Sequence, residues 1–184
     1  GKEYDDNGEL KFEGEYSYHI KNGKGKEYND KGELEYEGEY FNGMRYGKGY
    51  EKGKEIYENV EFEFEGQFLN DNKWNGKGKE YYDNGKLKFE GEYFKGKKWN
   101  GKLYNYNGIF DNEINDGKGY IKKYFNNNKI QFEGEYSNGQ RNGKGKEYYY
   151  NGQLLFVGEY LNGERNGKGK EYYYNKLKYD GEYL

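Results

Sequence analysis

A block of about twenty-four residues recurs along the whole chain, and this repeat constrains the fold more than any single residue does. Its consensus reads GKGKEYYxNGxLxFEGEYxNGxRN. A repeat of roughly 20 to 50 residues is typical of arrays in which one small unit stacks on copies of itself. The Gly-Glu-Tyr core of the unit begins at Gly14, Gly38, Gly91, Gly134, Gly158 and Gly181, with variants at Gly66 and Gly108. About eight units therefore fill residues 1–184 as one continuous array, and function is expected on its surface rather than in a separate catalytic domain.

The composition decides between a disordered and a folded chain. Charged residues make up 35% of the sequence, which by itself favours disorder. The net charge is only −3, however, and 26 Tyr and 11 Phe residues supply enough ring area for a thin aromatic core. Cys is absent, which excludes disulfides, thiolate metal sites and Cys nucleophiles. Lys and Glu are interleaved rather than segregated, so no nucleic-acid-binding face is predicted.

Residues 86–93 alternate between charged residues and residues that are apolar or glycine. This period of two is the signature of a half-buried strand, and it places Leu87, Phe89, Gly91 and Tyr93 on one face. Because glycine weakens strands, we expect an aromatic ring from the neighbouring strand to lie over each one. The predicted fold is all-β, an elongated single-layer antiparallel β-meander of tandem hairpins with two strands per unit.

Two connections are expected in each unit. Asn-Gly between alternating segments is a strong signal for a tight hairpin, and it occurs in 83–85 and its equivalents. Residues 138–143 and their equivalents are interpreted as the loop that links one hairpin to the next. Two units are irregular. Residues 47–66 contain about four extra residues, and 101–117 are about eight residues short, so Leu103 to Phe110 are expected to form one strand.

The repeat resembles the MORN repeat (membrane occupation and recognition nexus), most closely its variant subgroup. The resemblance is carried by Phe132-Glu133-Gly134-Glu135-Tyr136, then Gly139, then Gly143-Lys144-Gly145, and it recurs along essentially the whole chain. The His usual in the second loop of that family is replaced by Asn at residues 22, 75, 100, 142 and 166, so a function of that His is not carried over.

The resemblance implies a single-layer ribbon whose groove binds partner segments, often helices. It also implies a scaffold role in cytoskeletal, ciliary or membrane-junction assemblies. The function predicted is therefore a non-catalytic scaffold that binds a helical or extended segment of a protein partner through an aromatic-lined concave face. Two alternatives stay open: binding of acidic phospholipids at a membrane surface, which the resemblance also implies for some members, and an antitoxin-like role in binding a protein.

The predicted partner-binding residues are aromatic. Trp74 and Trp99 are the only tryptophans and are interpreted as equivalent loop residues, at the place where other units have Arg45, Arg141 and Arg165. Exposed Trp, Tyr and Arg are the residues that most often anchor interfaces. An equally weighted alternative is that each indole folds back over its own glycine-rich turn. The full predicted set is Trp74, Trp99, Tyr82, Tyr93, Tyr104, Tyr106, Tyr149 and Tyr173.

No enzyme activity, cofactor or specific metal site is predicted. Residues 96–102 have the glycine spacing of a phosphate-binding loop, but Leu103 occupies the position that needs Ser or Thr. Residues 111–117 match a calcium loop too poorly for more than weak cation affinity. Ser17 and His19 lack a readable orienting acid, and His19 is expected in an exposed loop. With no signal peptide or membrane span in the sequence, the protein is expected inside the cell, in the cytoplasm or on the cytoskeleton or cilium.

Overall fold

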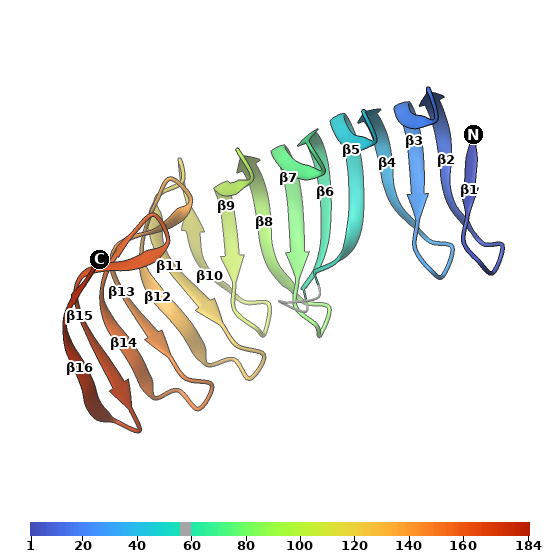
Figure 1. Cartoon of the computed structure of the whole chain (residues 1–184). Helices are drawn as coiled ribbons and strands as arrows, with labels where there is room; N and C mark the ends of the chain where they lie inside the picture. Colours follow the sequence, from blue (N-terminus) through green and yellow to red (C-terminus); the bar gives the residue numbers. More distant parts are fainter. Residues whose placement is uncertain (56–59) are drawn as a thin grey trace. The chain divides into compact units, whose positions relative to one another are not determined.

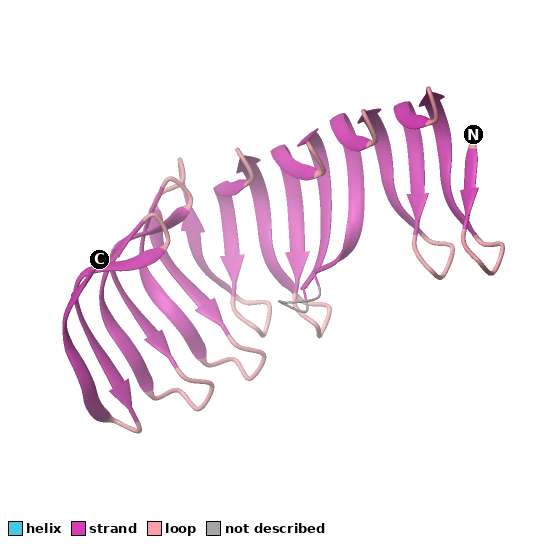
Figure 2. Ribbon diagram, viewed as in Figure 1, coloured by secondary structure: helices cyan, strands magenta, loops and turns pink. Residues whose placement is uncertain are grey.

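The computed structural model describes residues 1–55 and 60–184, and every regular element in these residues is a β-strand (Figures 1 and 2). In chain order the strands are β1 (Lys2–Tyr4), β2 (Leu10–Ser17), β3 (Ile20–Tyr28), β4 (Leu34–Phe41), β5 (Met44–Glu55), β6 (Val60–Leu69), β7 (Asn72–Tyr81), β8 (Leu87–Phe94), β9 (Lys97–Tyr104), β10 (Phe110–Ile114), β11 (Gly119–Tyr124), β12 (Ile130–Ser137), β13 (Gln140–Tyr148), β14 (Leu154–Leu161), β15 (Glu164–Tyr173) and β16 (Lys176–Tyr183). The all-β hairpin fold predicted from the sequence is confirmed.

The strands divide between two compact units. The first unit comprises Gly1–Glu80 and Glu92–Gly96, and the second comprises Tyr81–Gly91 and Lys97–Leu184. In both antiparallel sheets the strands follow one another in sequence order without crossovers, and β10 and β11 belong to different sheets. The β11 to β16 sheet, drawn from yellow to red in Figure 1, lies entirely in the second unit.

Two kinds of turn alternate along the meander. At one end, two-residue turns have positive φ at both central residues, as at Asn138 (53°) and Gly139 (71°), which is the geometry of a type I′ hairpin. At the other end, five-residue loops such as 82–86 and 149–153 have positive φ only at their fourth residue, Gly85 or Gly152. The hairpin connection predicted at residues 83–85 is present between β7 and β8, but it is a five-residue loop, and the tighter turn lies at the other Asn-Gly pair. The linking loop expected from the sequence at residues 138–143 is wrong, because β13 begins at Gln140.

The two irregular units have different causes. Strands β5 and β6 keep an unbroken register from Gly47↔Phe68 to Glu55↔Val60, so the extra residues lengthen this hairpin.

The prediction that Leu103 to Phe110 form one strand is wrong. Residues 105–109 form a five-residue loop, in which Asn105 Oδ1 accepts hydrogen bonds from the backbone N–H groups of Asn107 (3.0 Å) and Ile109 (3.1 Å). The side chain thus closes a loop that the shortened unit retains.

A row of glycines crosses the sheet of each unit. In the first unit Gly14, Gly25 and Gly38 face one another on β2, β3 and β4, and Gly49 continues the row on β5. A Cβ added at Gly14 would lie 2.7 Å from the Gly25 Cα, so no side chain fits between the strands here. The second unit repeats the row at Gly134, Gly145, Gly158, Gly169 and Gly181.

Aromatic rings cover each glycine row. The Phe12 ring lies over Gly14 on its own strand and over Gly25, and Tyr40 reaches Gly25 from the neighbouring strand β4. The expectation that a ring from the neighbouring strand covers each glycine is thus correct for Gly25. The ring that lies over Gly14 comes from its own strand. Phe and Tyr have this reach because side chains in a strand lean along its direction.

These rings form the core as a continuous run of edge-to-face contacts, a preferred geometry for aromatic pairs. Centroids in the first unit are 5.0–5.6 Å apart along Tyr16, Phe12, Tyr40, Tyr36, Phe68, Phe64 and Tyr93. They are 5.2–6.0 Å apart in the second unit along Tyr136, Phe132, Tyr160, Phe156, Tyr183 and Tyr179.

Candidate binding surfaces

The outer side of the ring layer is covered by basic side chains. The guanidinium carbons of Arg141 and Arg165 lie 4.2 Å from the ring centroids of Phe132 and Phe156, and that of Arg45 lies 4.5 Å from Tyr36. Cations over ring faces are attracted by the ring quadrupole. Charged side chains therefore cover much of the aromatic face.

Glutamates link these cations into ladders. Arg141 donates to Glu147 at 2.8 Å, Arg165 donates to Glu147 at 2.6 Å, and Arg165 also donates to Glu171 at 2.5 Å. In the first unit Arg45 likewise bridges Glu27 and Glu51. Each of these arginines bonds the glutamate six residues after it in the sequence, a spacing that recurs in three repeats and is a signal by which the pairs could have been found.

Burial alone would raise the pKa of the Glu147 carboxyl. The hydrogen bonds from Arg165 and Tyr160, with the charges of both arginines, outweigh this effect, so its pKa lies below the ordinary value. Glu147 therefore stays ionised near neutral pH and serves as an ion-pair partner, which is unsuited to a general acid.

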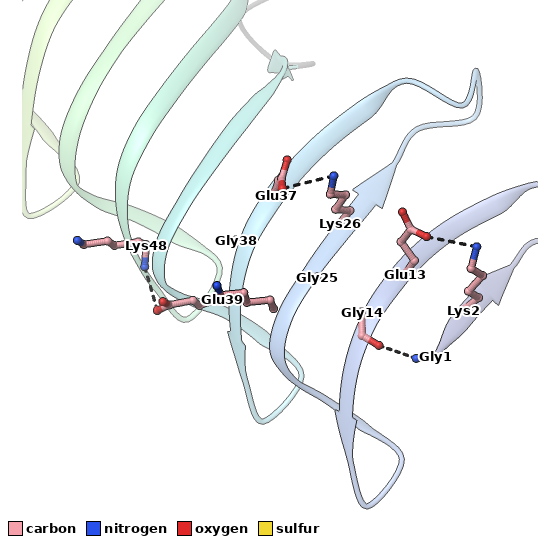
Figure 3. A pocket seen from close by; sticks show the side chains of 11 residues that line it. Gly1, Lys2, Glu13, Gly14, Gly25, Lys26, Glu37, Gly38, Glu39 and Lys48 are labelled. Carbon is pink, nitrogen blue, oxygen red and sulfur yellow. Dashed lines mark hydrogen bonds and ion pairs between the residues drawn. The ribbon is translucent and has the colours of Figure 1, made fainter.

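The opposite face carries an open trough of about 840 Å³ in the first unit (Figure 3). Its floor is the bare backbone of Gly14, Gly25 and Gly38. The residues before and after each glycine form its walls, because alternate side chains in a strand point to opposite faces. One wall carries Lys2, Glu13, Lys26 and Glu37, and the other carries Lys24, Glu39 and Lys48.

The two walls differ in charge pairing. Lys2 lies 3.3 Å from Glu13, and Lys26 lies 3.4 Å from Glu37, so the first wall is neutralised. On the second wall the Glu39 carboxylate accepts a hydrogen bond from the backbone N–H of Lys48 at 3.3 Å. Within residues 1–55 and 60–184, the ammonium groups of Lys24 and Lys48 have no ion-pair partner. The second wall therefore presents positive charge to the trough.

Both tryptophans lie in strands, β7 and β9, rather than in the loops expected from the sequence. Each indole is half-buried. Trp74 lines a second hollow of about 550 Å³ in the first unit, together with Phe62, Lys73 and Lys95. Trp99 lies against Gly117, a glycine in the next turn rather than in its own.

The tryptophans make the same backbone hydrogen bonds as the arginines at the equivalent position, but they do not supply the cation that lies over a ring. The Trp74 and Trp99 carbonyls accept hydrogen bonds from the next turn at 2.8 Å, as the Arg141 carbonyl does at 2.9 Å. The cation over a ring in these units instead comes from the residue before each tryptophan. Lys73 lies 3.0 Å from the centroid of Phe62, and Lys98 lies 4.9 Å from that of Phe89.

The predicted tyrosines fall into two groups. Tyr82, Tyr104 and Tyr106 come together in the second unit: the Tyr82 hydroxyl donates to the Tyr104 carbonyl at 2.9 Å, and the Tyr82 and Tyr106 rings lie 5.1 Å apart. Tyr149 donates to the Tyr172 carbonyl at 3.1 Å in the same unit, whose last hairpin exposes Tyr173. Tyr93 belongs to the ring run of the first unit. Partner contact by these residues stays a prediction.

The asparagines at the position of the family's usual His have a structural role that the sequence analysis missed. Asn75 Oδ1 accepts from the backbone N–H of Lys95 at 3.0 Å, and Asn100 Oδ1 accepts from that of Asp116 at 2.8 Å. Through this hydrogen bond, each of the two asparagines connects its own strand to the next two-residue turn. The bonded residues are 20 and 16 positions apart in the sequence, so no local sequence signal could have indicated this role.

The structure places the remaining sequence motifs in an exposed turn and on a strand. His19 has φ of 66° in the exposed turn between β2 and β3, as expected. Asp111 lies on strand β10, where it accepts from the Tyr124 hydroxyl at 2.7 Å. Among the described residues no group of three or more His, Cys, Asp or Glu side chains is arranged to hold a metal ion. The same residues include no helix that could span a membrane.

Tandem hairpins with a shared glycine row, ring layer and charge ladder define a β-hairpin repeat protein. The model of the MORN repeat matches residues 12–33, 36–59, 132–154 and 156–178. The model of the MORN repeat variant matches residues 1–18 and 74–95. The chain therefore belongs to the MORN repeat family, whose members are generally non-catalytic scaffolds, and the resemblance seen in the sequence is confirmed. No curated protein matches the chain.

Proposed function

We propose that the chain is a non-catalytic scaffold that binds a protein partner, and that the trough of the first unit receives an extended acidic segment of that partner. The observation that carries the proposal is the unpaired charge of Lys24 and Lys48 above a floor of bare glycine backbone. A floor without side chains allows a partner backbone to approach closely.

The spacing of the two lysines favours an extended partner. Lys24 and Lys48 occupy matching positions on β3 and β5, two strands apart, which corresponds to roughly 10 Å. An extended chain advances about 3.3 Å per residue and points alternate side chains the same way. Carboxylates two or four residues apart, roughly 7 or 13 Å, bracket this spacing, and the long lysine side chains can adjust to either. Complementary charge of this kind contributes mainly to association rate and specificity.

The aromatic part of the predicted site is retained as a second part of this proposal. Trp74 and Phe62 lie beside the hollow that also contains Lys73 and Lys95. Half-buried tryptophan is a frequent anchor in protein interfaces. We expect Trp74→Ala to weaken partner capture and Trp99→Ala, whose indole lies against Gly117, to act mainly on stability.

The test is affinity capture from the native source followed by mass spectrometry, comparing the protein with a Lys24→Glu/Lys48→Glu variant. A specific partner should be captured by the unmodified protein and lost with the variant, and its capture should weaken as salt is raised. Lys31→Glu with Lys118→Glu makes the same charge change at exposed positions outside the trough. If both variants capture the partner equally, the trough is not the binding site.

A further inference from the structure

The five loops and turns at one end of the second unit differ from their counterparts in the first. They are 82–86, 105–109, 125–129, 149–153 and 173–176, and together we call them the tyrosine edge (Figure 1, lower loops). The edge carries seven aromatic residues: Tyr82, Tyr106, Phe125, Tyr149, Tyr150, Tyr173 and Tyr174. The equivalent loops 5–9 and 29–33 of the first unit have no aromatic residue and six charged ones. Because loops 5–9 and 29–33 form without aromatic residues, the loop geometry itself does not require them.

Two rings are fixed in equivalent places along the edge. The Tyr106 hydroxyl donates to Asp83 at 2.8 Å, and the Tyr150 hydroxyl donates to Asn126 at 2.8 Å. In both cases the ring belongs to the second residue of its loop and bonds the second residue of an earlier loop. Each ring is therefore held against the edge rather than extended into solvent.

Side chains also lock the loops to one another. Asn84 donates to the Tyr106 carbonyl at 3.0 Å, and Asn127 donates to the Tyr150 carbonyl at 2.8 Å. Lys129 donates to the Asn151 carbonyl at 2.8 Å, which engages one of the few cations of the edge. A surface ordered in advance loses little conformational freedom when a ligand binds.

The held ring of Tyr150 and the two rings of the last turn are nevertheless largely open to solvent. Tyr150 is 55% exposed, Tyr173 is 57% exposed and Tyr174 is 68% exposed. The rings of Tyr173 and Tyr174 contact each other at 4.5 Å. Exposed rings that are held in place and surrounded by Asn and Gly resemble the composition of binding loops more than that of ordinary turns.

The chemistry of the edge selects the class of ligand. Four charged residues among its five segments are too few for a nucleic acid or an acidic membrane, which require clustered basic side chains. The five segments contain no Arg, Trp or Met, the other residues enriched at protein interfaces. Tyrosine rings among polar, largely uncharged side chains suit a sugar instead, because the C–H face of a pyranose stacks on a ring while its hydroxyls bond neighbouring polar groups.

We propose that the tyrosine edge binds a linear, neutral β-1,4-linked glycan, in addition to the protein-binding function proposed for the first unit. Successive hairpin loops repeat every two strands, roughly 10 Å, which is comparable to the length of one disaccharide in such a chain. The flat, equatorially substituted sugars of a β-1,4 chain can stack on the exposed rings of two successive segments of the edge, Tyr150 in one and Tyr173 and Tyr174 in the next. Helical α-linked chains cannot keep this contact.

The test is isothermal titration calorimetry of the full chain with cellohexaose, chitohexaose and, for comparison, maltohexaose. At least one β-linked oligomer should give saturable binding, and maltohexaose should bind more weakly. Tyr150→Ala/Tyr174→Ala should weaken this binding about tenfold or more, the loss expected when aromatic contact residues are removed. Tyr18→Ala, which truncates a tyrosine that is 95% exposed in the first unit, should leave it unchanged.

Two further variants keep the result interpretable. Tyr150→Phe retains the ring and should retain most of the affinity even if the alanine variant folds poorly. Lys24→Glu/Lys48→Glu should bind the oligomers normally, which separates this proposal from the trough. Absence of saturable binding to both β-linked oligomers at millimolar concentration would overturn it. Equal loss in Tyr18→Ala, or an edge that binds only a protein, would overturn it as well.

Discussion

At the scale of single residues, the glycine row is the feature of the fold that tolerates substitution least. A Cβ at Gly14 would meet backbone, with the Lys24 carbonyl oxygen at 2.6 Å and the Gly25 Cα at 2.7 Å, in addition to the Phe12 ring. Backbone paired in a sheet cannot move aside as a flexible side chain can. The row therefore constrains both the spacing of the strands and the layer of rings above it.

We expect Gly14→Ala to lower the free energy of unfolding by about 1–3 kcal/mol, the usual cost of overpacking. Chemical denaturation followed by circular dichroism measures this change. Gly53→Ala is the matched control, because Gly53 also lies in a strand but its added Cβ would meet only the Phe62 ring, at 3.2 Å. Equal stability of the two variants would contradict the role assigned to the row.

Part of this residue-scale picture could be predicted from the sequence and part could not. The period of two places Phe132 and Gly134 on one face without any structure, and both are found there. The ladder of Arg141, Glu147 and Arg165 was not predicted, because Arg141 and Glu147 are six residues apart on β13 and Arg165 lies on β15. Their contact depends on a register that shifts between Gly134 and Tyr136, and composition gives no information about such a bulge.

At the scale of elements, the turns explain why hairpins were predicted correctly while their boundaries were not. Asn-Gly occurs at both ends of the strands, at 107–108 and at 138–139, and favours a turn in either place. The Asn-Gly pair alone therefore does not decide which turn forms. Asn105 bonds two backbone N–H groups and closes a five-residue loop, whereas Ser137 pairs directly with Gln140 across a two-residue turn.

Asn105→Ala should therefore destabilise the hairpin of β9 and β10. It removes two hydrogen bonds, and at a net contribution of about 0.5–1.5 kcal/mol for each bond the expected loss is about 1–3 kcal/mol. Thermal unfolding and amide hydrogen exchange in residues 97–114 would both report it. Asn107→Ala alters the same loop without removing either bond, so a loss as large as that of Asn105→Ala would argue against side-chain closure.

At the scale of the whole molecule, the ring runs make a core in which tyrosine largely takes the place of aliphatic residues. The hydroxyls of such a core must stay protonated, because a buried phenolate is unfavourable. Burial, with the hydrogen bond to Glu3 adding to it, raises the pKa of Tyr16 to about 12. The hydrogen bond to Glu90, followed by burial, raises the pKa of Tyr104 to about 12. Burial also raises the pKa of Tyr40 and of Tyr160.

These shifts predict alkaline unfolding. A tyrosine whose pKa is higher in the folded state than its ordinary value of 10 stabilises the fold fully below pH 10. That stability falls as the pH rises from 10 through 12, because the unfolded chain releases the proton first. We expect loss of the β-sheet circular dichroism signal in this range, together with a cooperative rise in tyrosinate absorbance. Tyr160→Phe, which removes a buried phenol bonded to Glu147, should shift the transition to higher pH relative to the exposed control Tyr173→Phe. Gradual ionisation near pH 10 with the sheet signal intact would mean that the rings are not buried as a core.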